Sequence, residues 1–123
     1  MKIIEGGVTA AKGYQAIGIA AGIKSGKKDM AMLYSQVPCA VAGTFTANVV
    51  KAAPVKWDRE IVRGKGTARA VVMNSGIANA CTGQEGMDCC RETAEKAGQI
   101  LGVETDQVLV ASTGVIGRQL PMD

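Results

Sequence analysis

The first half of the sequence shows the alternation of apolar with small or polar residues that is typical of β-strands. Isoleucine alternates with alanine or glycine over residues 16–23, and this period of two predicts a strand. Residues 24–28 are polar and contain a glycine, which predicts a turn, and residues 29–34 have the pattern of a second strand. We therefore expect a hairpin, and we predict a third strand over residues 39–46.

The second half alternates between helical and strand patterns. Pro54 is a favourable first helical residue and Gly64 is a stop, so a short helix is predicted between them. Residues 68–73 predict a fourth strand and residues 107–111 a fifth. The chain between these two strands has the period of a long helix.

The long helix has a start signal, an apolar face and a stop signal. Thr82 and Glu85 match the T-x-x-E capping box, and Gly102 is a typical C-terminal stop. The residues that share the apolar face are Met87, Cys90, Ala94, Ala97 and Leu101. A stripe of this kind is core, and we assign it no other role.

These elements predict an α/β domain of the layered α+β type, with an N-terminal hairpin followed by strand–helix–strand–helix–strand. Residues 1–123 are expected to form a single domain. The fourth and fifth strands end in small polar residues with glycine, at residues 74–83 and 112–117. If these strands are parallel, both ends open at one edge of the sheet, where α/β proteins usually bind ligands.

Residues 108–117, V-L-V-A-S-T-G-V-I-G, are the most informative stretch of the sequence. The apolar part predicts a buried strand, which we expect to break at Ser112-Thr113-Gly114 and to leave main-chain N–H groups unpaired. Unpaired N–H groups, with the Thr113 hydroxyl beside them, are suited to binding a developing oxyanion. The alternative is that Ser112 and Thr113 only cap the next turn.

The composition restricts the chemistry that these residues can perform. The chain has no histidine, so it cannot assemble a Ser-His-Asp or Cys-His mechanism by itself. Its four cysteines contain no C-x-x-C pair, so no zinc site is expected, and Cys89 and Cys90 are interpreted as small helix residues. Free thiols and the absence of a secretory pattern at the N-terminus favour the cytoplasm.

Charge and hydropathy argue against nucleic-acid and membrane partners. The net charge is only +3, and Lys24, Lys27 and Lys28 are interpreted as a solvated loop because no aromatic residues interleave with them. No apolar run approaches the length that spans a membrane. Residues 22–28 fail as a phosphate-binding loop, because three residues separate the glycines where four are needed.

Four stretches of the sequence together resemble the ornithine acetyltransferase (glutamate N-acetyltransferase) family of arginine biosynthesis. They are G-G-V-T-A at residues 6–10, A-G-T-F-T-A-N at residues 42–48, A-N-A-C-T-G at residues 78–83 and S-T-G-V-I-G at residues 112–117. They follow the order of the family and span nearly the whole chain. Two positions depart from the family pattern: Ile77 replaces a usual asparagine, and Ala11 replaces a common proline.

The resemblance implies a fold of the ornithine acetyltransferase/DmpA-like type and an acetyl transfer from N-acetylornithine to glutamate through an acyl-threonine. It implies that this chain is the N-terminal part of an alpha chain, and that autocatalytic cleavage of a longer precursor creates the N-terminal threonine nucleophile of a beta chain. By match of motif, Thr113 and Gly114 form the oxyanion hole. An N-terminal threonine uses its own amine as the base, so the lack of histidine is no obstacle.

The resemblance also implies an alpha2-beta2 heterotetramer without a cofactor or metal, with small-molecule substrates only. We therefore expect the isolated chain to be inert. We expect residues 16–23 and 68–73 to be exposed strands that need partners. Bifunctional members of the family also acetylate glutamate with acetyl-CoA as the donor, and the resemblance includes this activity as an alternative. The alternative is a non-catalytic scaffold fragment or a small-ligand binding module of the same fold.

Overall fold

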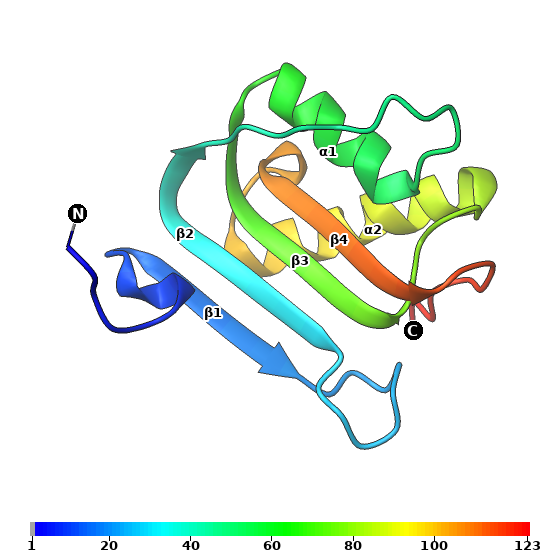
Figure 1. Ribbon diagram of the computed structural model, residues 1–123, viewed down its shortest axis with the longest axis horizontal. Helices are drawn as coiled ribbons and strands as arrows, with labels where there is room; N and C mark the ends of the chain where they lie inside the picture. The colour runs from blue at the N-terminus through cyan, green and yellow to red at the C-terminus, as the bar shows by residue number, and fades with distance from the viewer. Residues whose placement is uncertain (1) are drawn as a thin grey trace.

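The computed structural model describes residues 2–123, which begin with the predicted N-terminal hairpin (Figure 1). A short 3-10 turn, η1 (Val8–Ala10), precedes β1 (Tyr14–Ile19), which pairs antiparallel with β2 (Met30–Ala40). β1 ends earlier than the predicted residue 23. The reason is the carboxylate of Asp29, which accepts hydrogen bonds from the main-chain N–H groups of Ala21 and Lys24, both at 2.6 Å, and so folds residues 20–28 into a loop.

The sheet has four strands in the order β1-β2-β3-β4 (Figure 1). β3 (Thr67–Ile77) pairs antiparallel with β2 and parallel with β4 (Val108–Val115). The succession β2, α1, β3, α2, β4 after the β1–β2 hairpin confirms the predicted α/β order. The expectation that residues 68–73 form an exposed strand is wrong, because β3 lies inside the sheet between β2 and β4.

The separate third strand predicted over residues 39–46 is also wrong, because β2 continues to Ala40. The β2–β3 register shifts between Tyr34 and Cys39, which marks an irregularity in the pairing. There the Ser35 hydroxyl donates to the Val37 carbonyl at 2.7 Å, and the guanidinium of Arg69 binds the main-chain carbonyl of Ser35 at 3.2 Å. These side-chain bonds stabilise the irregular segment between Tyr34 and Cys39, so β2 is one continuous strand where the sequence pattern predicted two.

The two helices form where the sequence predicted them. α1 (Ala53–Arg63) has Pro54 in its first turn, and α2 (Gly83–Leu101) ends at Gly102 with φ 65°, where the Gly102 N–H binds the Gly98 carbonyl. The capping box of Thr82 and Glu85 does not form. Instead the Thr82 hydroxyl lies 2.6 Å from Oδ1 of Asn79, which diverts it from the helix main chain.

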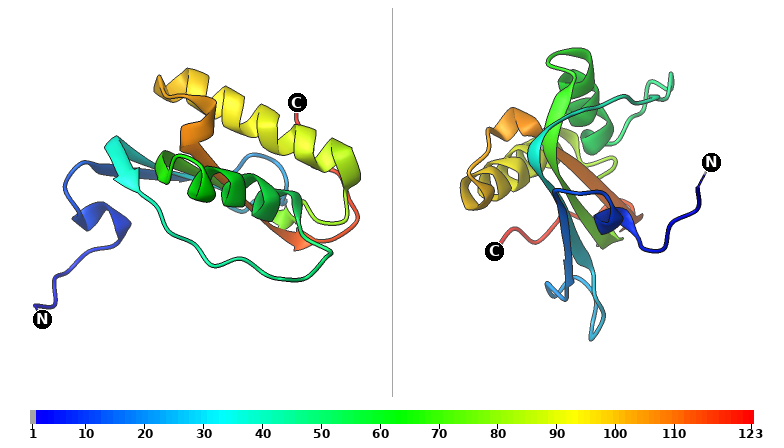
Figure 2. Two further views of the ribbon diagram at one scale, coloured as in Figure 1. Left: turned by 90° about the horizontal axis from the view of Figure 1, so that it is seen from above. Right: turned by 90° about the vertical axis from the view of Figure 1, so that its left-hand side faces the viewer.

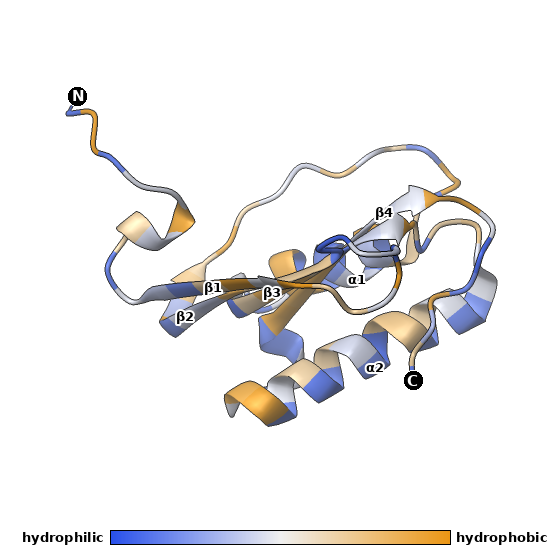
Figure 3. Cartoon of the chain, turned by 90° about the horizontal axis from the view of Figure 1, so that it is seen from below, coloured by the Kyte–Doolittle hydropathy of each residue, from blue (hydrophilic) through white to orange (hydrophobic). Residues whose placement is uncertain are grey.

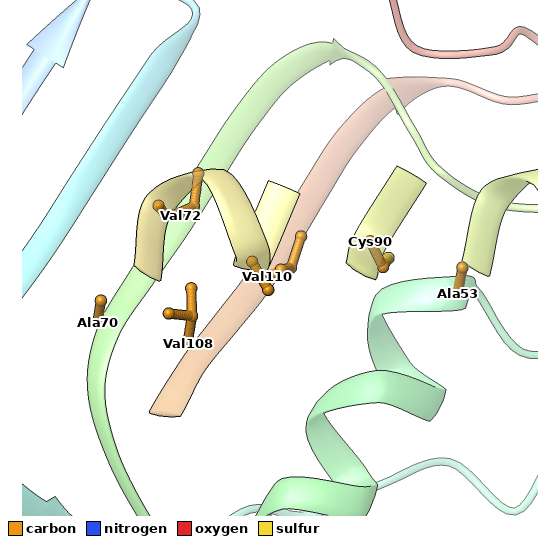
Figure 4. Close-up of a cluster of buried hydrophobic side chains, with 8 residues drawn as sticks. Ala53, Ala70, Val72, Cys90, Val108 and Val110 are labelled. Carbon is orange, nitrogen blue, oxygen red and sulfur yellow. The ribbon is translucent and has the colours of Figure 1, made fainter. Parts of the chain in front are cut away.

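α2 lies along one face of the sheet, whereas α1 lies along the outer edge of β4 (Figure 2). Hydrophobic and hydrophilic residues interleave along α2 (Figure 3), and its buried side chains include Cys90, Ala94 and Ala97, as predicted for the apolar face. Val108 and Ala94 are fully buried, at 0% exposure, in a cluster with β3 and β4 (Figure 4). Small side chains on α2 let the helix approach the sheet closely.

The other face of the sheet is more open. Half-buried Leu33, Val71 and Leu109 line a shallow cavity of about 190 Å³ there. Within residues 2–123, the helices are too short or too polar to cross a lipid bilayer.

Candidate functional site

The two polar, glycine-bearing stretches of the sequence lie side by side at the end of the β3–β4 pair. β3 and β4 are parallel, and Asn74, Ser75 and Gly76 pair in register with Ser112, Thr113 and Gly114. The structure therefore brings both stretches to one edge of the sheet, as expected for parallel strands. The predicted break of the strand at Ser112 is wrong, because β4 continues through Thr113 and Gly114 to Val115.

Two facing glycines explain why these small residues do not interrupt the ladder. Gly76 and Gly114 both have positive φ, at 115° and 139°. A Cβ on Gly114 would lie 2.2 Å from the carbonyl carbon of Gly76, which is closer than any real side chain approaches. With no side chains between them, the strands stay paired, and the Ala78 N–H binds the Val115 carbonyl at 2.9 Å. Glycine is therefore required at residue 114.

The direction of the main chain in β4 follows from the bonds on its two sides. The Val115 carbonyl faces β3, whereas the Val110 N–H faces away from it and donates to Asp58 Oδ1 at 3.0 Å. Because N–H directions alternate along a strand, the Gly114 N–H also points away from β3. Thr113 and Gly114 are both exposed. A main-chain donor and a hydroxyl thus stand together at an accessible edge, which is a suitable arrangement for binding an oxyanion.

The structure also weighs against a simple capping role for Ser112. Its Oγ is buried and has no hydrogen-bond partner among the described residues. Residue 112 is part of β4, so there is no turn at this position for it to cap.

A cavity of about 340 Å³ adjoins this edge of β4, and Asp58 is one of the residues that line it. Its walls come from α1, from the segment before α1 and from β4, with Phe45, Val110 and Ser112 among them. Burial raises the pKa of Asp58 to about 6, although the hydrogen bond from the Val110 N–H acts in the opposite direction. Asp58 therefore loses its proton at a higher pH than an ordinary aspartate, while it holds the outer edge of β4.

Lys24 belongs to the site, although the sequence pattern placed it in a solvated loop. Its ammonium donates to Ser75 Oγ at 2.8 Å, and Ser75 is the partner of Thr113 across the strands. Asp29 fixes the Lys24 main chain and is only 3% exposed, and the bonds from the Ala21 and Lys24 N–H groups lower the pKa of its carboxyl. The sequence alone does not predict this contact, because residues 24–28 contain three lysines and their spacing does not distinguish Lys24 from the other two.

The second polar loop, in contrast, is structural. Asn79 is 2% exposed, and its Nδ2 donates to the Gly86 carbonyl at 2.7 Å. Asn74 donates to the Ile77 carbonyl at 2.8 Å. Ile77 itself is buried at 8% exposure, so the residue that departs from the family pattern lies in the interior. These contacts hold the start of α2 against the end of β3.

The cysteines divide into two environments. Cys89 and Cys90 are buried, as expected of small helix residues, and burial raises the pKa of the Cys90 thiol to about 12. Hydrogen bonds with Ser35 and Tyr14 lower the pKa of the Cys39 thiol. Residues 2–123 contain no cluster of three or more histidine, cysteine or acidic side chains that could hold a metal ion.

Comparison with known sequences gives the relatives of this chain. The model of the ArgJ family matches residues 15–123. The "Arginine biosynthesis bifunctional protein ArgJ" of Gloeobacter violaceus is 55% identical over 121 residues, which are 98% of this chain and 30% of that protein. The protein of the same description from Thermosynechococcus vestitus is 50% identical over 98% of this chain and 29% of its own length. The chain thus spans about 30% of the curated relatives that it matches.

Two solved structures have the same fold. The arginine biosynthesis bifunctional protein ArgJ of Bacillus halodurans superposes with a TM-score of 0.91 at 42% identity, over 95% of this chain and 61% of that one. The ornithine acetyltransferase of Mycobacterium tuberculosis, solved in complex with ornithine, gives a TM-score of 0.89 at 47% identity, over 94% of this chain and 63% of that one. With the family model covering residues 15–123, this chain belongs to the ArgJ family.

Proposed function

We propose that this chain is the N-terminal part of the alpha chain of a cytoplasmic ornithine acetyltransferase, which transfers an acetyl group from N-acetylornithine to glutamate. In this proposal, Thr113 and Gly114 form the oxyanion hole. The observation that carries it is the paired end of β3 and β4, where the Gly114 N–H faces away from the sheet beside the exposed Thr113. Membership of the ArgJ family and the ornithine complex of a relative support the same activity.

The proposed mechanism divides the reaction between two chains. A threonine at the N-terminus of a beta chain, created by cleavage of a common precursor, attacks the acetyl carbonyl with its own amine as base. Negative charge develops on the carbonyl oxygen and is met by the Thr113 hydroxyl and the Gly114 N–H. The intermediate then expels the ornithine amine and leaves an acetyl-threonine. The amine of glutamate attacks this ester, and the same two donors stabilise the second oxyanion.

Several further features belong to the same proposal. We propose that two alpha and two beta chains associate as an alpha2-beta2 heterotetramer, and that this chain alone is inert. β1 is an outer strand of the sheet, and Ile17 and Ile19 on it are 62% and 45% exposed. An open edge with apolar side chains is suited to association. Size-exclusion chromatography and intact mass spectrometry of the purified enzyme test this, and a stable monomer without a second chain contradicts it.

The oxyanion hole is tested by Thr113→Ala in the whole enzyme. Loss of one such donor costs about 2.7–4 kcal/mol, so we expect the turnover number to fall about 100- to 1,000-fold with KM nearly unchanged. Steady-state kinetics with N-acetylornithine and glutamate measure both values. Thr113→Ser keeps the hydroxyl and should retain most of the activity.

The neighbouring Ser112 provides the matched control. Ser112→Ala removes a hydroxyl that has no hydrogen-bond partner, and we expect little change in rate. If Thr113→Ala and Ser112→Ala have the same kinetics, Thr113 is not a donor to the oxyanion and the chain is better described as a scaffold.

A further inference from the structure

Lys24 places a positive charge next to the proposed oxyanion hole. Its ammonium is fixed by Ser75 Oγ at 2.8 Å, and Ser75 lies opposite Thr113 on the neighbouring strand. Adjacent strands are about 4.8 Å apart, so the charge is held roughly one strand away from Thr113. The stem of Lys24 runs over Gly76, where a Cβ would lie 3.1 Å from Lys24 Cγ. Glycine at residue 76 is therefore what lets this side chain reach Ser75.

The Lys24 charge has no acidic partner among the described residues. The two ion pairs there join Lys65 to Asp106 and Lys96 to Glu92. The nearby carboxylate of Asp29 is occupied by the main-chain N–H groups of Ala21 and Lys24. Lys24 is half-buried as a residue, and its ammonium, bound only by a neutral hydroxyl, retains capacity for an anion.

We propose that Lys24 binds the α-carboxylate of the amino-acid substrate, an inference that rests on the proposed acetyl transfer. N-acetylornithine and glutamate both carry a carboxylate on the carbon next to the reacting nitrogen. The Gly114 N–H points away from β3, so the carbonyl oxygen lies beyond β4 from Ser75 and Lys24. The carboxylate on the neighbouring carbon lies a few ångströms from that oxygen, and an ion-pair contact adds about 2.8 Å, which together can span β4 and reach the Lys24 ammonium. One fixed cation thus serves the donor and the acceptor in turn.

The test combines a change in the enzyme with a change in the substrate. Steady-state kinetics of the whole enzyme are measured with N-acetylornithine and with its α-carboxamide, which lacks the negative charge. A hydrogen bond between charged groups is worth about 1.5–3 kcal/mol, so we expect the carboxamide to raise KM of the wild-type enzyme about 10- to 100-fold. Lys24→Met should raise KM for N-acetylornithine by a similar factor, and the carboxamide should then bring no further increase.

Matched variants distinguish the effect of losing the Lys24 charge from the effect of disturbing the fold. Lys24→Arg keeps a cation and should recover most of the affinity, whereas Lys27→Met removes an exposed charge from the same loop and should leave KM unchanged. Ser75→Ala keeps the ammonium but releases it from its anchor, and should give a smaller increase in KM than Lys24→Met. Equal thermal midpoints for Lys24→Met and Lys27→Met show that any difference in KM does not come from unfolding.

Two negative outcomes have different meanings. If the wild-type enzyme transfers no acetyl group, the proposed function itself fails. If it is active but the carboxamide raises KM by the same factor in Lys24→Met as in the wild type, only the role of Lys24 is overturned.

Discussion

The first and second halves of the β3–β4 pair share one ladder but serve different purposes. In the first half, Ala70 lies opposite Val108 and Val72 opposite Val110, and all four are at most 3% exposed. In the second half, Thr113 and Gly114 are exposed beside small residues of β3. Because the main-chain pairing is continuous, the difference comes from the side chains. The buried half anchors the ladder by its packing, and in the proposed function the exposed half of the same ladder holds the two donors in place.

Gly114→Ala should give the largest loss of stability, because it disrupts the pairing of β3 and β4 in the second half of the ladder and leaves the first half unchanged. The new methyl group would meet the Gly76 carbonyl carbon at 2.2 Å, at a φ of 139° that alanine rarely adopts. We expect the free energy of unfolding to fall by about 3 kcal/mol or more, from the sum of strain and overpacking. Chemical denaturation of the whole enzyme measures this loss.

Gly117→Ala is the control for backbone strain without a clash. Gly117 also has a positive φ, 82°, but an added Cβ would meet nothing within 4 Å. A loss of only about 1–2 kcal/mol is expected there. Equal losses at the two positions would mean that the close approach of β3 and β4 is unimportant.

Val108→Ala tests the first half of the pair. Val108 is fully buried, at 0% exposure, so removing two methyl groups should lower the free energy of unfolding by about 2 kcal/mol. The turnover number of the remaining folded enzyme should stay the same. Val115→Ala, at a position 56% exposed, should change stability by less than about 0.5 kcal/mol. A large loss of turnover in Val108→Ala would show that the core also adjusts the site.

Asp58→Asn tests the boundary between the halves, where the Asp58 carboxylate binds the Val110 N–H. The pKa of Asp58 is about 6 in the folded chain, against an ordinary value of 3.8. At a pH between these two values, Asp58 is mostly protonated in the folded chain and mostly ionised in the unfolded chain. The stability contributed by Asp58 is thus present below about pH 4 and is lost as the pH rises through 6. Asparagine keeps the acceptor oxygen without this loss.

We therefore expect Asp58→Asn to gain stability relative to the wild type as the pH rises from 4 to 7, by about 1 kcal/mol because solvent screens part of the effect. Thermal unfolding midpoints across this range measure the gain. Parallel curves for the two proteins would show that Asp58 has an ordinary pKa.

The sequence predicted best where a single local signal decides the outcome. Pro54 and Gly102 mark the start of α1 and the end of α2 in the structure, because proline and a left-handed glycine act within one turn of chain. The apolar stripe of α2 was found for a similar reason, since Cys90 and Ala94 repeat at the helical period and are buried. These signals need no knowledge of distant contacts.

The sequence predicted less well where contacts between distant residues decide the structure. Nothing local to Thr113 or Gly114 shows that Gly76 lies opposite and keeps the strand intact. The hydrogen-bond partner of Lys24 is Ser75, 51 positions away, and the spacing of the lysines does not predict this contact. Thr82 and Glu85 matched a capping box, but Asn79 competes for the same hydroxyl. The motif located the candidate site, whereas its geometry required the fold.

The contact between Trp57 and β4 has a practical consequence. The indole N–H of Trp57 donates to the Val108 carbonyl at 2.9 Å, on the outer edge of the strand that carries Thr113 and Gly114. Trp57 is the single tryptophan of the chain. Its fluorescence is therefore an intrinsic optical signal for this chain of whether α1 is docked on β4, and a red shift of the emission would report the release of that edge.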